Sequence, residues 1–89
     1  MAQLEVELTN RLGLHARAAA KFVHTASLFA AHVTVLHNEE EVNGKSILGL
    51  LLLAAPVGTR LTVKASGKDE VEALKAIEAL IRDRFGEGE

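Results

Sequence analysis

The feature that most restricts the fold of this chain is a strict alternation of apolar and charged residues near its start. Within residues 3–8, Leu4, Val6 and Leu8 take every second position, and glutamates lie between them. This period of two predicts a strand with one buried and one solvated face. The same alternation returns over residues 60–65. The rest of the chain must provide a layer that covers the buried faces of these strands.

Segments with helical spacing can provide that layer. The first has apolar residues at positions i, i+3, i+4 and i+7, namely Ala19, Phe22, Val23 and Ala26. It predicts a helix that ends at about Ser27 or Ala30. A second, short apolar helix is expected over residues 47–55, with Ser46 as its N-cap and Pro56 as its stop.

A third helix is expected near the end of the chain. Asp69 should cap it, with Glu72 three residues later completing a capping box, and Gly86 should end it. Its predicted buried face consists of Val71, Leu74, Ile77 and Ile81.

Two further strands complete the pattern. Residues 32–36 are rich in β-branched side chains, and residues 40–43 form a weaker segment. Asn38, in the turn between them, is the residue best able to adopt a positive φ. The order β-α-β-β-α-β-α predicts an α+β fold, an open-faced sandwich in which three helices pack on one face of a four-stranded antiparallel sheet. Residues 1–89 are expected to form one domain.

Charge and composition exclude several classes of function. The net charge is −2 and the chain has three Phe but no Tyr or Trp, so we expect no nucleic-acid partner. Without cysteine, and with His24, His32 and His37 lacking partners at ligand spacing, no metal or cofactor is expected. The start resembles no signal peptide and the longest apolar run is too short to span a bilayer, which predicts a cytoplasmic protein without membrane insertion.

His15 is the candidate reactive residue because it lies at or just before the predicted start of the first helix. The first N–H groups of a helix lack partners and attract anions, and Arg17 adds a guanidinium within the first turn. A histidine in a loop is usually a solvated side chain without a role. Here the helix start, Arg17 and Gly13 converge on one imidazole, which suggests that His15 accepts a phosphoryl group.

Two motifs, Gly13–Arg17 and Lys45–Gly49, together with the order of elements and the residues Gly67–Glu70, resemble the histidine-containing phosphocarrier (HPr) family of the bacterial phosphotransferase system. The resemblance covers essentially the whole chain. One position departs from the family pattern, because Ala18 stands where the family usually has proline. Proline there mainly fixes φ, so we expect a slightly less rigid helix start and unchanged chemistry.

The resemblance implies a phosphoryl carrier that is a substrate of other phosphotransferases and not itself an enzyme. His15 would accept the phosphoryl group from enzyme I, which phosphoenolpyruvate charges, and pass it to sugar-specific IIA components, with Arg17 assisting both steps. The acceptor atom is expected to be Nδ1, the ring nitrogen that can face the helix amides. Ser46 would be a regulatory phosphorylation site in lineages that possess an HPr kinase/phosphorylase and regulatory partner proteins. A sugar-transport branch and a nitrogen-regulatory branch both fit this fold.

The second helix has more large apolar side chains than one buried stripe needs, which predicts an exposed docking surface. The expected docking residues on the two helices beside His15 are Ala16, Ala20, His24, Ile47, Leu48 and Leu51. The alternatives are that these residues belong to the core and that Ser46 is only an N-cap.

A hydrolase with His15 as general base would need a nucleophile and an orienting acid around a cleft, for which the chain has little room. A purely regulatory binding module is a third class. We expect a monomer.

Overall fold

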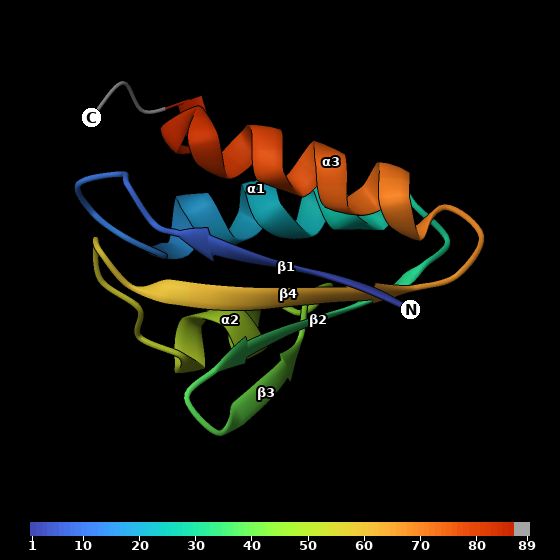
Figure 1. The fold of residues 1–89 in the computed structure, drawn as a ribbon. Helices are drawn as coiled ribbons and strands as arrows, with labels where there is room; N and C mark the ends of the chain where they lie inside the picture. The colour runs from blue at the N-terminus through green and yellow to red at the C-terminus, as the bar shows by residue number, and fades with distance from the viewer. Residues whose placement is uncertain (87–89) are drawn as a thin grey trace.

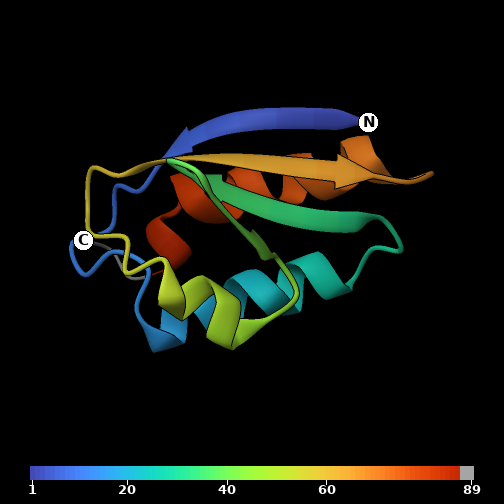
Figure 2. The same ribbon diagram turned by 90° about the horizontal axis from the view of Figure 1, so that it is seen from below.

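The computed structural model describes residues 1–86, and its elements follow the predicted order (Figure 1). They are β1 (Ala2–Glu7), α1 (Ala16–Ser27), β2 (His32–His37), β3 (Glu40–Asn43), α2 (Ile47–Leu52), β4 (Arg60–Ser66), α3 (Glu70–Arg82) and the 3-10 turn η1 (Arg84–Gly86). The strands form one antiparallel sheet in the order β1-β4-β2-β3. Figure 2 shows the sheet as one layer and the helices as the other. The predicted open-faced sandwich is therefore confirmed.

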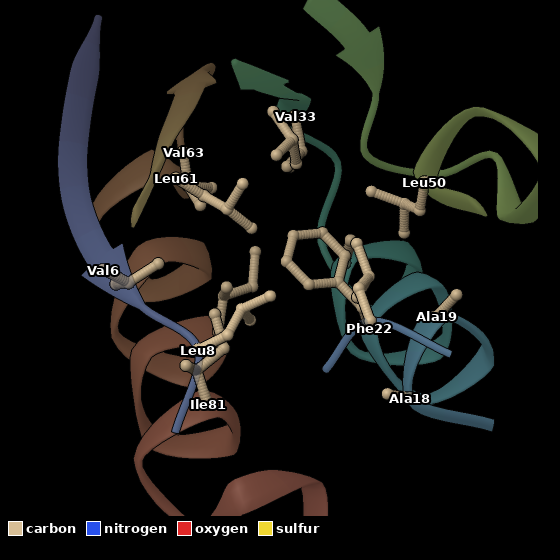
Figure 3. Close-up of a cluster of buried hydrophobic side chains, with 14 of the residues drawn as sticks. Val6, Leu8, Ala18, Ala19, Phe22, Val33, Leu50, Leu61, Val63 and Ile81 are labelled. Atoms are coloured by element: carbon tan, nitrogen blue, oxygen red, sulfur yellow. The ribbon is translucent and has the colours of Figure 1, made fainter. Parts of the chain in front are cut away.

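The core lies between the two layers and is built by the alternation that the sequence shows. In β1 and β4, Val6 faces Leu61 and Leu4 faces Val63, so the apolar positions of the two strands coincide. The helices add Phe22 from α1 and further large side chains from α2 and α3 (Figure 3). Among the described residues, no helix is both long and apolar enough to cross a membrane.

The predicted turn between β2 and β3 is confirmed, but the predicted second helix is too long. Asn38 has φ of 55°, as expected for the turn between β2 and β3. The second helix was expected to reach residue 55 but ends at Leu52. Ala54 then adopts φ of 49°, a left-handed conformation that breaks the helix before Pro56 is reached.

The predicted capping box at the third helix is wrong. The Asp69 carboxylate makes no cap hydrogen bond and instead accepts the N–H groups of Ala30 and Ala31, each at 2.8 Å. Two charge-assisted bonds to the connection between α1 and β2 replace one local cap. The bond from Ala30 is the largest cause that lowers the Asp69 pKa below 3.8, and the bond from Ala31 adds to it, while partial burial works in the opposite direction.

The buried face of α3 also differs at its first turn. Val71 was expected to be buried but is 51% exposed, and Ala73 lies in the core in its place. At 100° per residue, Val71 lies about 120° around the helix axis from Ile77, at the edge of the buried stripe. The helix ends at Arg82, before the predicted end at Gly86, and η1 follows it.

Candidate functional site

The loop that precedes α1 is fixed by a buried asparagine. Asn10 is fully buried, and its side-chain amide donates to the Gly13 carbonyl at 2.6 Å. In return, the Gly13 N–H donates to the Asn10 carbonyl at 3.1 Å. The next residue, Leu14, is buried and bonds through its N–H to the Ala55 carbonyl at 2.9 Å. The loop is therefore held by the two bonds between Asn10 and Gly13 and by the bond from Leu14 to the segment that follows α2.

Gly13 is the only residue type that fits its position. Its φ is 67°, in the left-handed region. A Cβ atom built there would lie 2.5 Å from the Ala55 carbonyl oxygen and 2.8 Å from the Pro56 Cα. Both neighbours are backbone atoms, which cannot move aside as a flexible side chain can. The bare backbone of Gly13 lets the loop pack closely against residues 55–56, two positions before His15.

His15 is the N-cap of α1. Its backbone is extended, with φ of −82° and ψ of 179°, and its Nδ1 accepts the Arg17 N–H at 3.2 Å. Its carbonyl accepts the Ala19 N–H at 2.8 Å, the first bond of the helix. The imidazole thus replaces the short polar side chain that usually caps a helix. Nδ1 faces the positive end of the helix dipole.

His15 opens onto a depression of about 650 Å³ that is accessible from solvent. The residues that line it are Arg11, Leu12, His15, Ala16, Arg17, Lys21 and Gly86. Three of these side chains are cationic and, among the described lining residues, none is a carboxylate. The depression therefore suits an anion at the ring of His15. Because it is open, a partner protein can reach the ring directly.

Ser46 is the N-cap of α2, as the sequence predicts. Its Oγ accepts the Gly49 N–H at 3.1 Å, and its carbonyl accepts the Leu50 N–H at 3.1 Å. The side chain is half-buried. Beside it, the Lys45 ammonium donates to the Phe29 carbonyl at 2.8 Å, which ties the start of α2 to the connection that follows α1.

The expected docking residues fall into two groups. Ile47 and Leu48 on α2 are exposed, Leu48 to 75%, and so are Ala16, Ala20 and His24 on the neighbouring helix α1. Leu51 is half-buried and packs against the core. Two further exposed leucines were not predicted: Leu52, 76% exposed on the same helix as Leu48, and Leu12, 67% exposed in the loop before His15.

The other histidines do not line the His15 depression. His24 is in the last turn of α1, and His32 and His37 lie at the two ends of β2. Within residues 1–86, no group of three or more His, Cys, Asp or Glu side chains could hold a metal ion.

Asn10 and Lys21 were also not predicted from the sequence. Asn10 had a local signal, because an asparagine three residues before a glycine is typical of a side-chain-stabilised turn. Lys21 had none, since its partner is the carbonyl of Phe85, 64 residues away in the chain.

Comparisons with known proteins give one consistent result. The model of the family described as "PTS HPr component phosphorylation site" matches residues 2–83. The phosphocarrier proteins HPr of Neisseria meningitidis (serogroup A) and Pseudomonas aeruginosa are 51% and 50% identical, with 100% of each chain covered. A crystal structure of HPr from Thermoanaerobacter tengcongensis superimposes with a TM-score of 0.95 at 44% identity, covering 98% of both chains.

Proposed function

The chain belongs to the HPr family of phosphotransferase-system phosphocarriers, and on this premise we propose that His15 accepts a phosphoryl group from enzyme I and passes it to sugar-specific IIA components. Phosphoenolpyruvate would charge enzyme I, and sugar uptake would consume the group. The carrier would work as a cytoplasmic monomer. The observation that supports this function best is the position of His15 Nδ1, which caps the N-terminus of α1 inside a cationic depression.

The geometry suggests how the phosphoryl group is received. The Nδ1 lone pair that accepts the Arg17 N–H is also the nucleophile, because Nε2 carries the proton in this tautomer. When the Nδ1–P bond forms and the donor's bond to phosphorus breaks, the Arg17 N–H loses its acceptor on the ring. A phosphoryl oxygen, bearing negative charge, can take over that bond. The helix start thus stabilises the product in place of the cap.

Arg17 would act through its guanidinium as well as its amide. The side chain is exposed in the first turn of α1, where a cation is unfavourable next to the helix dipole. A phosphoryl group on His15 would reverse that balance, because the guanidinium would then face a dianion. We therefore assign Arg17 to stabilisation of the phosphoryl group during transfer.

The apolar surface on α1 and α2 would dock the two partners. Its expected members are Ala16, Ala20, His24, Ile47, Leu48 and Leu51, and the exposed Leu52 extends it. Ser46 lies at the edge of this surface, so a phosphate placed there by an HPr kinase/phosphorylase would add charge beside the apolar contact. Such a phosphate would also suit the start of α2, so that regulation and capping are compatible.

The proposed function is tested by charging the protein with phosphoenolpyruvate and enzyme I and measuring the mass. The best variant is His15→Asn, because asparagine can still cap the helix but has no nucleophilic imidazole. His24→Asn is the matched control on the same helix. We expect one acid-labile, alkali-stable phosphoryl group on the wild type and the control and none on His15→Asn. A phosphoryl group on His15→Asn would overturn the proposal.

A further inference from the structure

The 3-10 turn η1 adopts an unfavourable backbone conformation. Arg84, Phe85 and Gly86 have φ of 53°, 56° and 75°, so three consecutive residues are left-handed and two of them carry a Cβ atom. Residues with a Cβ rarely adopt this conformation in succession. Such strain persists only where the surrounding structure fixes it, and it is most often found at functional sites.

Two contacts fix the turn against the body of the protein. The side chain of Phe85 is fully buried in the core, and its carbonyl accepts a hydrogen bond from the Lys21 ammonium on α1. The turn is closed by the Gly86 N–H, which donates to the Asp83 carbonyl at 2.8 Å. The bond from Lys21 joins the turn to the helix that His15 caps.

This attachment makes η1 a wall of the His15 depression. Gly86 lines the depression together with His15 and Arg17. Lys21 lines it too, one helical turn after Arg17 and on the same face of α1. Lys21 thus links α1, whose N-terminus His15 caps, to η1 at the edge of the depression.

We propose that Lys21 is a positioning residue of the His15 site, which holds the C-terminal turn as a wall that shields the phosphoryl group from water. The proposal rests on the function proposed above. Hydrolysis of the phosphohistidine needs a water molecule whose oxygen bonds to phosphorus while the P–Nδ1 bond breaks. The hydroxyl then leaves with the phosphate and the remaining proton goes to the ring or to solvent. The depression stays open to partners, but the turn limits the approach of that water from the side that Gly86 lines.

The test loosens the wall from its two sides, at Lys21 and at Gly86. Lys21→Met keeps the aliphatic stem and removes the bond to Phe85, and Lys75→Met removes the same charge from an exposed position on α3. Gly86→Ala keeps Lys21 but places a Cβ atom on a residue with φ of 75°, 3.4 Å from the Lys21 Nζ. Gly58→Ala is its control, because that glycine also has a positive φ and its Cβ would meet nothing within 4 Å.

Two quantities are measured on each variant. The first is hydrogen exchange of the Gly86 amide, which reports opening of the turn. It should speed up about tenfold in Lys21→Met, the factor expected for loss of a bond from a charged donor. The second is the half-life of phosphohistidine after enzyme I is removed. It should shorten by about threefold or more in Lys21→Met and Gly86→Ala and stay at the wild-type value in both controls.

The outcomes separate this inference from the proposed function. If the wild type takes no phosphoryl group on His15, the proposed function itself fails. If it is phosphorylated but the half-life in Lys21→Met and Gly86→Ala equals that of the wild type, only the role of Lys21 is refuted. A half-life shortened equally in Lys75→Met would assign the effect to net charge and would also refute the wall. Lys21→Arg, which can still donate to Phe85, should restore most of the half-life.

Discussion

Replacing Gly13 by alanine tests whether the loop before His15 is held by close contact with residues 55–56. Two costs are expected. The left-handed φ of 67° is unfavourable for alanine by roughly 1–2 kcal/mol, of which about 0.4–1 kcal/mol is returned because alanine is less flexible in the unfolded chain. The second cost is the contact of the new Cβ with backbone atoms of Ala55 and Pro56 at 2.5 and 2.8 Å. Overpacking of this kind costs typically ~1–3 kcal/mol.

Gly58→Ala isolates the first cost. Gly58 has φ of 88°, and a Cβ there would meet nothing within 4 Å. We therefore expect a loss of about 1 kcal/mol in the free energy of unfolding for Gly58→Ala and about 2–4 kcal/mol for Gly13→Ala. For a domain of this size, each kcal/mol corresponds to roughly 4–8 °C in Tm.

The assay is urea unfolding followed by far-ultraviolet circular dichroism, since the chain has no Trp or Tyr to report by fluorescence. Phosphorylation by enzyme I is measured on the same proteins at a temperature where both are folded. The Gly13 carbonyl accepts the Asn10 side-chain amide and the His15 N–H, so a displaced loop should slow phosphorylation of Gly13→Ala but not of Gly58→Ala. Equal losses of stability in the two variants would refute the close contact.

Three further predictions follow from single contacts. Because the bonds from Ala30 and Ala31 lower the pKa of Asp69 below 3.8, its stabilisation is present above about pH 4 and is lost as the pH falls through the folded-state pKa. The Tm of Asp69→Asn should therefore lie below that of the wild type at pH 7, and the gap should narrow as the pH falls below about 4. Curves that stay parallel would contradict this. Ala54→Gly should raise the free energy of unfolding by about 0.5–1 kcal/mol, because Ala54 is exposed and its φ of 49° favours glycine. A Tm of the variant below that of the wild type would show that the conformation of Ala54 carries no strain. Ser46→Asp should be about 0.5–2 kcal/mol more stable than Ser46→Ala, because the aspartate keeps an acceptor for the Gly49 N–H. The Asp variant should nevertheless show a higher KM with enzyme I than the Ala variant. Identical enzyme I kinetics for the two variants would mean that Ser46 is only a cap.

The layers of the fold were predictable because they depend on local periodicity. Alternation in β1 and β4 identified the buried faces, and the spacing around Phe22 identified α1. The capping box at Asp69 failed for the opposite reason. A local pattern was present, but the carboxylate found partners at Ala30 and Ala31, which a sequence pattern cannot place beside it.

The site was likewise predictable only where it depends on residues that are adjacent in the sequence. The position of His15 at a helix N-terminus follows from residues adjacent in sequence, and the structure has Nδ1 facing the helix as expected. The depression around it depends on a wall from the other end of the chain and on the contact between Lys21 and Phe85. Likewise, the apolar content of α2 predicts an exposed face, but which leucine is exposed depends on how that helix lies on the core.

The most direct test of the proposed mechanism is nitrogen-detected NMR of the phosphorylated protein with 15N-labelled histidine and backbone amides. We expect the phosphorus coupling on Nδ1 of His15, and a large shift of the Arg17 amide proton as its acceptor changes from the ring nitrogen to a phosphoryl oxygen. Phosphorus on Nε2, or an Arg17 amide unchanged by phosphorylation, would contradict the account in which the helix start that His15 caps is the site that stabilises the phosphoryl group.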